Sequence, residues 1–490
     1  MSLLRTAQKG AAVTLVGQAA RFILQAGSMV ALARLLDADD FGVVAMVTAV
    51  TGLALVISDF GLSLAYVQAE KVTEQERTNL YWLNLSAGVL LFCLSYACAE
   101  QLATLYRDPR LVEVCQALSF VFLLTCATAQ HRADLSRQLR FGALARCDVL
   151  SAAVSTGVAV LSALNGAGYW ALVWQQITMA LVSSLLLVWA VPWAPSRPRE
   201  LANLKPYVRF GINTSLVQIL NYATSNVDSV LIGRRWGATE LGYYDRAYQL
   251  FKVPLNQIAA PMTRVAVPVL SRSGTAAQFR ELLDTGRLAL VFSVGLLFLF
   301  VSATSSFLVP IVFGPGWTQS APVLSILTLG GFFQALTYPY FWVFLSRAET
   351  GLQLRFSVFT KVIAIALMII GSHWGILGVA SAAALGSCLN WLILTCLAMP
   401  RLGLDAGVLL RTTLIPVGWI AVPALLSYAL SFWLNNVTSI AGLSACAGIY
   451  TAWILGTLTV SQNARSMLVH AKILIRSKMQ SKKVRDDKEN

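Results

Sequence analysis

Charged residues are scarce in this sequence. Of its 490 residues only 12% are Asp, Glu, Lys or Arg, whereas 57% are hydrophobic, and a soluble domain usually carries about a quarter charged residues. So little charge cannot cover the surface of a water-soluble protein of this size. The apolar surface must therefore face lipid, where the backbone has to satisfy its own hydrogen bonds within helices. The composition predicts an all-α integral membrane protein.

Residues for catalysis or metal binding are also few. The three histidines (His131, His373 and His470) lie far apart, and the eight cysteines form no Cys-x-x-Cys pair. No ATP-binding glycine motif and no Ser/His/Asp arrangement is present. We therefore expect no metal, no cofactor and no enzymatic activity. Any energy for work would come from a proton or sodium gradient, or from the gradient of a substrate.

Apolar runs long enough to cross a membrane recur along the whole chain. A helix of about 20 residues spans a hydrocarbon core of about 30 Å. Fourteen such runs are predicted, at residues 11–33, 41–67, 80–105, 111–130, 143–164, 168–192, 207–232, 243–270, 287–313, 321–345, 354–372, 375–399, 411–434 and 438–460. A basic tail, residues 461–490, follows the last run.

Basic residues are distributed unevenly between the two sides of this predicted topology. One alternate set of loops and termini, counted with the span ends beside them, holds 27 of the 37 Lys and Arg residues. The opposite set, counted in the same way, holds 6, and 4 lie further inside spans. This bias is the positive-inside pattern and predicts that both termini are cytoplasmic. It also accounts for the net charge of +14 without a nucleic-acid partner. The basic tail is expected to meet anionic lipid headgroups.

The two halves of the chain repeat one pattern. At an offset of 200 residues Arg34 meets Arg234, Ala38 meets Ala238 and Gly42 meets Gly242. At an offset of 215, residues 138–141 (QLRF) recur at 353–356. We predict a six-helix lobe over 1–200, a second over 201–400, and two additional helices within 401–460. Internal repeats of this kind are typical of secondary transporters, whose substrate site lies between the lobes.

Several segments resemble the polysaccharide transporter family, and in particular its Wzx-type flippases of the colanic acid exporter kind. The segments are 32–46 (LARLLDADDFGVVAM), 58–68 (SDFGLSLAYVQ), 80–85 (LYWLNL), 209–213 (RFGIN), 226–234 (NVDSVLIGR), 241–248 (LGYYDRAY) and 313–318 (FGPGWT). The resemblance runs from about residue 1 to residue 400.

This resemblance implies a specific activity. Such proteins translocate undecaprenyl-pyrophosphate-linked oligosaccharide units across the bacterial inner membrane for exopolysaccharide, capsule or lipopolysaccharide synthesis. They share the fold of multidrug and toxin extrusion transporters and of the lipid II flippase, with two six-helix bundles around a cavity. A polysaccharide polymerase and a chain-length regulator are possible partners. The alternative is a cation-coupled multidrug or metabolite antiporter of the same fold.

Charged residues within the predicted spans are the candidate functional residues, because a charge at bilayer depth costs roughly 2.5–3.5 kcal/mol. Four basic residues lie away from the span ends: Arg21, Lys252, Arg264 and Lys361. They are candidate ligands for an anionic substrate. Arg21 could instead form a structural ion pair, for example with Asp59, and Arg264 and Lys361 could extend to the headgroups.

Among the acidic residues within spans, Asp59 and Asp228 are the candidates for function. Each could carry a coupling proton or sodium ion, or could pair with a neighbouring arginine. Four tryptophans near span ends (Trp170, Trp174, Trp317 and Trp374) are expected to anchor the protein at the membrane interface.

Overall fold

The computed structural model describes residues 2–58, 62–69, 72–198, 205–433 and 438–460. In that part of the chain every regular element is a helix, so the predicted all-α class is confirmed. Nine helical segments are long and apolar enough to span a membrane. They include ten of the fourteen predicted spans, because the segment Thr350–Leu402 holds two. The other four correspond to α1, α2 and the two arms of α9, the second arm continuing into α10.

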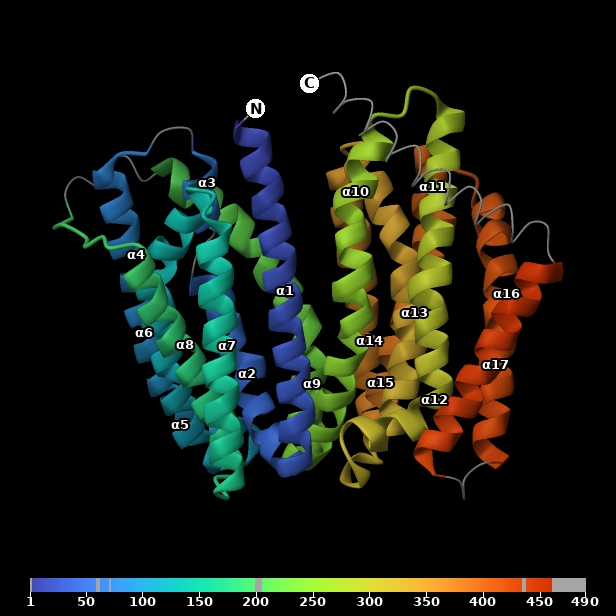
Figure 1. Ribbon diagram of the computed structural model, residues 1–490, viewed down its shortest axis with the longest axis horizontal. Coiled ribbons are helices and arrows are strands. Elements are labelled where there is room, and N and C mark those ends of the chain that lie inside the picture. Colours follow the sequence, from blue (N-terminus) through green and yellow to red (C-terminus); the bar gives the residue numbers. More distant parts are fainter. Residues whose placement is uncertain (1, 59–61, 70–71, 199–204, 434–437, 461–490) are drawn as a thin grey trace.

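The helices form two bundles, here called the N-lobe and the C-lobe (Figure 1). The N-lobe comprises α1 (Ser2–Leu35), α2 (Ala38–Ser58), α3 (Leu62–Gln68), α4 (Glu74–Ala97), α5 (Ala99–Tyr106), α6 (Arg110–Arg137), α7 (Phe141–Leu164) and α8 (Trp170–Ala190). The C-lobe comprises α9 (Lys205–Pro254), α10 (Ala260–Ser271), α11 (Ala276–Leu290), α12 (Leu296–Val312), α13 (Ser320–Ser346), α14 (Thr350–Gly371) and α15 (Gly375–Ile393). Two further helices, α16 (Ala406–Trp433) and α17 (Ser439–Val460), pack along α12.

Local sequence signals determine where several helices begin and bend. Thr73 and Glu76 form a capping box that begins α4: the Thr73 hydroxyl accepts from the Glu76 amide at 3.2 Å, and the Thr73 amide donates to the Glu76 carboxylate at 2.8 Å. The two side chains satisfy amides that have no partner within the helix. Pro254 ends α9, and a π-helical turn, Leu255–Ala259, follows it. Proline lacks the amide that would continue the ladder, so the helix is irregular at this point.

The sequence prediction was wrong for residues 233–242, which it assigned to a loop. They are helical and belong to α9, whose two arms meet at Gly237. Gly237 has φ of 85°, a conformation that glycine adopts without steric cost. A sharp reversal at one residue therefore replaces the predicted ten-residue connection.

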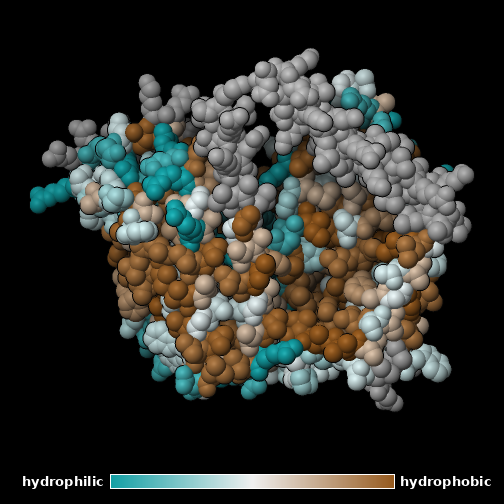
Figure 2. Space-filling view, in the orientation of Figure 1, coloured by the Kyte–Doolittle hydropathy of each residue, from teal (hydrophilic) through white to brown (hydrophobic). Residues whose placement is uncertain are grey.

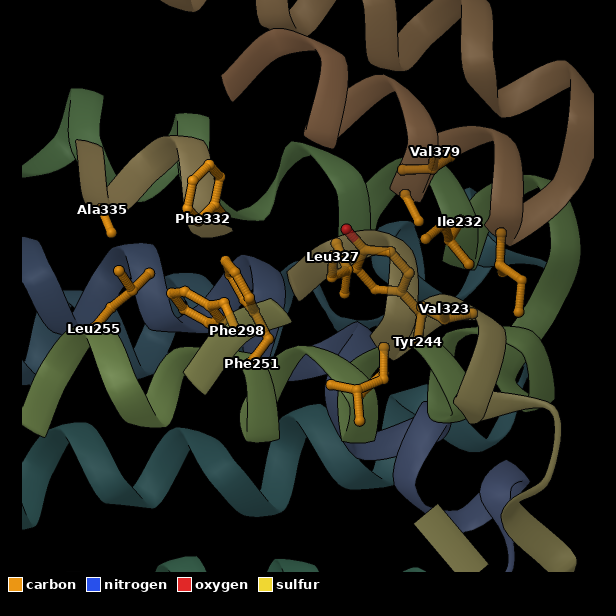
Figure 3. Packing of buried hydrophobic residues seen from close by; sticks show 14 of the residues in the cluster. Ile232, Tyr244, Phe251, Leu255, Phe298, Val323, Leu327, Phe332, Ala335 and Val379 are labelled. Carbon is orange, nitrogen blue, oxygen red and sulfur yellow. The ribbon is translucent and has the colours of Figure 1, made fainter. Parts of the chain in front are cut away.

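The core of the C-lobe is built from aromatic and aliphatic side chains of α9, α12 and α13 (Figure 3). The rings of Phe251 and Phe298 lie 5.8 Å apart between centroids. A Cβ atom at Gly331 would lie 2.4 Å from the Phe251 ring and 2.9 Å from the Phe298 ring, so the missing side chain makes room for these aromatics. This packing holds α9, which carries much of the candidate site, against α12 and α13.

The two lobes converge at one end of the molecule and spread apart at the end where α1 begins (Figure 1). The surface has a hydrophobic belt with hydrophilic residues at both ends, and a hollow lies between the lobes in the upper half of this face (Figure 2). The lobes meet along α2 and α9. The protein is thus a multi-span membrane protein with its lobes closed together at one end.

The contact at the converging end, here called the interlobe contact, follows the sequence repeat. Gly42 packs directly on the backbone of Ala238, and Gly242 packs on the backbone of Ala38. Each pair joins α2 of the N-lobe to α9 of the C-lobe, and the two pairs exchange positions at an offset of 200. The repeated Ala and Gly residues therefore form a two-fold symmetric contact.

Polar and aromatic groups reinforce the interlobe contact. The Thr239 hydroxyl donates to Asp39 at 3.1 Å. The Trp317 indole donates to the Ala33 carbonyl at 2.6 Å, and its ring packs edge-on against Phe41 with centroids 5.4 Å apart. Trp317 is only 3% exposed, so the prediction that it anchors at the membrane interface was wrong. It is a buried part of the contact between the lobes.

Candidate functional site

Arg21 belongs to an ion-pair triad in the N-lobe. Its guanidinium lies 3.5 Å from the Asp148 carboxylate of α7. The same carboxylate also pairs with Arg132 of α6. Two guanidinium groups share one carboxylate, so the triad keeps a net positive charge. The side chains of Arg21 and Arg132 are 37% and 42% exposed, so both remain accessible.

The Arg21 Nε atom is buried without a hydrogen-bond partner. Gln18 and Gln25, which share a helix face with Arg21, are both exposed. The polar face of α1 is therefore open, and Arg21 has donor capacity left for an anion. Its partner in the described structure is Asp148, while the suggested partner, Asp59, lies outside the described residues.

A cavity of about 220 Å³ in the C-lobe brings together two of the predicted residues, Asp228 and Lys361. Its walls come from α9, α13, α14 and α15. The polar lining residues are Thr224, Ser225, Asp228, Tyr248, Gln334, Thr360, Lys361, Ser387 and Asn390. The Lys361 ammonium donates to the Asn221 side-chain oxygen at 2.5 Å. Lys361 is thus held towards α9 within the lobe.

Asp228 is 3% exposed and is held by two hydrogen bonds. The Tyr244 hydroxyl donates to it at 2.7 Å, and the Ser229 amide donates at 2.8 Å. The Lys252 ammonium lies within electrostatic range of Asp228 and 4.1 Å from the centroid of the Tyr248 ring. A buried carboxylate with these partners can exchange a proton or attract a small cation.

Arg264 lies apart from this cluster. It is on α10, its side chain is exposed, and no carboxylate of the described residues comes within ion-pair distance of it. The structure therefore brings together Asp228, Lys252 and Lys361 in the C-lobe, places Arg21 in the N-lobe, and leaves Arg264 on a separate helix.

The polar contacts of the two lobes occupy corresponding places. In the N-lobe, Arg21 of the first helix meets Asp148, which lies seven residues after Phe141. At the repeat offsets Arg21 corresponds to Asn221, and Phe141 corresponds to Phe356. In the C-lobe Asn221 meets Lys361, five residues after Phe356. In each lobe a cation therefore bridges equivalent helices, with the donor and acceptor exchanged.

Sequence reasoning missed Asp148 and Arg132 as members of the site. Asp148 lies within the predicted span 143–164, and an acidic residue at that depth is itself a signal of function. Arg132 was assigned to a cytoplasmic loop, whereas α6 continues through it to Arg137. Within the described part of the chain, no three His, Cys, Asp and Glu residues gather in a way that could hold a metal ion.

Solved membrane transporters share this architecture. The lipid II flippase MurJ in an inward closed conformation superimposes with a TM-score of 0.72 at 13% identity, covering 91% of this chain and 98% of that one. An inward-facing multidrug resistance transporter of the MATE family gives a TM-score of 0.59 at 12% identity, covering 80% and 96%. At such identities the likeness shows the fold, with its two bundles and fourteen spans.

Curated relatives are named for polysaccharide biosynthesis. The teichuronic acid biosynthesis protein TuaB of Bacillus subtilis is 31% identical over 307 residues, 62% of this chain and 63% of TuaB. The chain thus matches slightly less than two thirds of that relative. The lipopolysaccharide biosynthesis protein WzxC of Escherichia coli is 26% identical over 375 residues, 74% of this chain and 73% of WzxC.

A family model described as polysaccharide biosynthesis protein matches residues 31–322, more than half of the chain. That range contains the interlobe contact, the Arg21 partners Arg132 and Asp148, and Asp228 with Tyr244 and Lys252. The chain therefore belongs to the polysaccharide biosynthesis protein family.

Proposed function

We propose that this protein is a flippase, which moves lipid-linked oligosaccharide units across the bacterial inner membrane by alternating access. The observation that carries the proposal is the pair of cations at equivalent places in the two lobes, Arg21 and Lys361. Each lies within an apolar helix, where an unpaired charge is costly, and each keeps only partial compensation from the protein. An anionic group bound between the lobes would neutralise the positive charge that remains.

The diphosphate of a lipid-linked saccharide suits such a site. Guanidinium groups form charge-assisted, bidentate hydrogen bonds with phosphate oxygens. Asp148 would hold Arg21 and Arg132 in position, and its ion pairs with them would weaken when the substrate binds. Lys252, close to the cavity, would add positive charge from the C-lobe, and Arg264 on α10 would guide the anion on its way.

Alternating access would proceed by rocking of the two lobes, with the units 1–200 and 201–400 moving as bodies and 401–460 following the second. The interlobe contact closes one end. With the termini in the cytoplasm, as the charge distribution predicts, that closed end is the outer one and the protein is open to the cytoplasm. Asp228 would respond to a proton or sodium ion and couple the gradient to the motion. A polymerase and a chain-length regulator would act on the product outside.

Transport by the purified protein tests the proposal. Proteoliposomes would be loaded with a fluorescent undecaprenyl-diphosphate oligosaccharide, and its exposure on the far leaflet would be followed with a membrane-impermeant quencher. Arg21→Gln and Lys361→Gln should each lower the rate at least about tenfold, because a charged hydrogen bond contributes roughly 1.5–3 kcal/mol. Arg355→Gln is the matched control, since Arg355 is exposed on α14 and is not part of the site.

Thermal unfolding of each variant should remain close to that of the wild type, so that lost transport reports the site and not the fold. Wild-type protein that leaves the lipid in its original leaflet contradicts the flippase assignment. Equal rates for the two site variants and for Arg355→Gln contradict the assigned roles. Multidrug antiport remains the alternative, and it rests on fold likeness alone, whereas the sequence relatives are named for polysaccharide synthesis.

A further inference from the structure

Three arginines line one pocket at the converging end of the lobes. Arg107, Arg234 and Arg235, with Thr104 and Leu105, surround a cavity of about 370 Å³. Arg107 follows α5 in the N-lobe, whereas Arg234 and Arg235 lie in α9 of the C-lobe. The pocket is therefore shared between the lobes.

Neighbouring residues explain why these arginines meet. Tyr106 is 4% exposed, and its ring packs directly on Gly233, where a Cβ atom would come within 2.8 Å of the ring. Arg107 follows Tyr106 and Arg234 follows Gly233 in the sequence, so this contact places the two arginines side by side. On the other side, Arg235 donates to the Ser372 hydroxyl at 2.7 Å, which fixes its guanidinium.

The three arginines have no carboxylate partner among the described residues. Other arginines at this end do: Arg110 lies 2.5 Å from Asp39 and 2.7 Å from Asp108, and Arg246 lies 2.5 Å from Asp245. Like charges held together without a counterion repel one another. A pocket that gathers three of them across two lobes is therefore incomplete without an anion.

Two features argue that the charge of these side chains has a role. Arg107 adopts φ of 60°, at a helix end where glycine or asparagine is preferred, because a larger side chain is strained in that conformation. The three arginines also lie on the side that we propose to be outer, where the positive-inside rule disfavours them. They make up half of the six basic residues predicted on that side.

We propose that this pocket binds a phosphate-bearing anion at the outer membrane surface. Guanidinium groups recognise phosphate by bidentate, charge-assisted hydrogen bonds. Because the ligand contacts both lobes, it binds best while they are together and so stabilises the closed interlobe contact. The site is separate from Arg21 and Lys361, and it does not depend on which substrate crosses the membrane.

Binding of inorganic pyrophosphate to the full-length protein in detergent tests this assignment. In a background where Arg21→Gln and Lys361→Gln remove the proposed substrate site, isothermal titration should show one site. The triple variant Arg107→Gln/Arg234→Gln/Arg235→Gln, made in the same background, should bind at least about tenfold more weakly. The matched control is Arg272→Gln/Arg355→Gln/Arg411→Gln. It removes the same charge from three exposed arginines of the C-lobe and α16 and should bind as the background protein does.

A triple variant that binds pyrophosphate as tightly as the control overturns the site. To test coupling to the closed state, a single cysteine at Ala33, which is 2% exposed under Trp317, would report opening through maleimide labelling. Saturating pyrophosphate should slow this labelling at least about threefold in the wild type and leave the triple variant unchanged. An unchanged rate in the wild type overturns the coupling.

Nanodiscs distinguish the two sources of such an anion. If a lipid headgroup is the resident ligand, discs containing phosphatidylglycerol should abolish the pyrophosphate signal that phosphatidylcholine discs retain. If a diphosphate outside the bilayer is the ligand, both discs should give the same titration. Both results support a phosphate site. The absence of a binding signal in detergent and in both kinds of disc overturns it. Because no transport is measured, a failure of the flippase proposal would leave this test intact.

Discussion

Replacing Gly42 with alanine should loosen the contact that closes one end of the protein. A Cβ atom at Gly42 would lie 2.8 Å from the Ala238 Cα and still closer to its carbonyl, and one at Gly242 would lie 3.1 Å from the Ala38 Cα. Non-bonded carbon atoms prefer roughly 3.5–4.0 Å. The Ala238 carbonyl oxygen would lie only 1.7 Å away. The facing atoms are backbone and cannot rotate away, so α2 and α9 would have to separate by roughly 1–2 Å.

The size of the effect follows from packing. Overfilling a close contact costs typically 1–3 kcal/mol, and here the strain exists only while the lobes are together. The ratio of open to closed molecules should therefore rise roughly 5- to 150-fold. Gly242→Ala should act in the same direction, because it occupies the symmetric place.

Labelling of the Ala33→Cys reporter by an impermeant maleimide measures this ratio, in a background without the eight native cysteines. Gly157→Ala is the control, because nothing lies within 4 Å of a Cβ atom at that helical position. A companion protein that retains only Cys126, 1% exposed within the N-lobe, reports unfolding and should label slowly in every variant. Equal labelling at Ala33→Cys in Gly42→Ala and Gly157→Ala would refute the reasoning.

Three further substitutions probe other contacts. Asp228→Asn should abolish any dependence of transport on a proton or sodium gradient while Tyr244 keeps its hydrogen bond, as measured in proteoliposomes with imposed gradients; retained dependence would exclude Asp228 from coupling. Trp317→Phe removes the donor to Ala33 and should raise the rate of maleimide labelling at Ala33→Cys roughly 5-fold, for a bond contributing about 1 kcal/mol. A rate like the wild type's would show that water replaces the bond. Arg287→Met removes the hydrogen bonds from buried Arg287 to α16 and should lower the free energy of unfolding by about 1.5–3 kcal/mol. Unchanged denaturant midpoints would contradict that role.

Much of the architecture could be predicted because lipid imposes simple rules on sequence. Apolar runs of fixed length must be helices, and the repeated residues around Gly42 and Gly242 indicated a duplicated bundle. The candidate cations Arg21 and Lys361 were also visible, since charges stand out in apolar runs. Predictions failed where a single residue changes the path of the chain: Gly237 replaces a loop by a sharp bend, and Trp317 is buried at the interlobe contact instead of lying at the interface.

The sequence by itself determined that the protein lies in a lipid bilayer, that it is helical, that it contains a repeat and which charges lie within the membrane. Each of these is a local or periodic property of the chain. Only the tertiary structure decided which charges meet. Arg21 with Asp148, Lys361 with Asn221, and Arg107 with Arg234 are separated by more than a hundred residues in sequence. Such pairs depend on how helices pack and on where glycines allow close approach, and no local pattern records them.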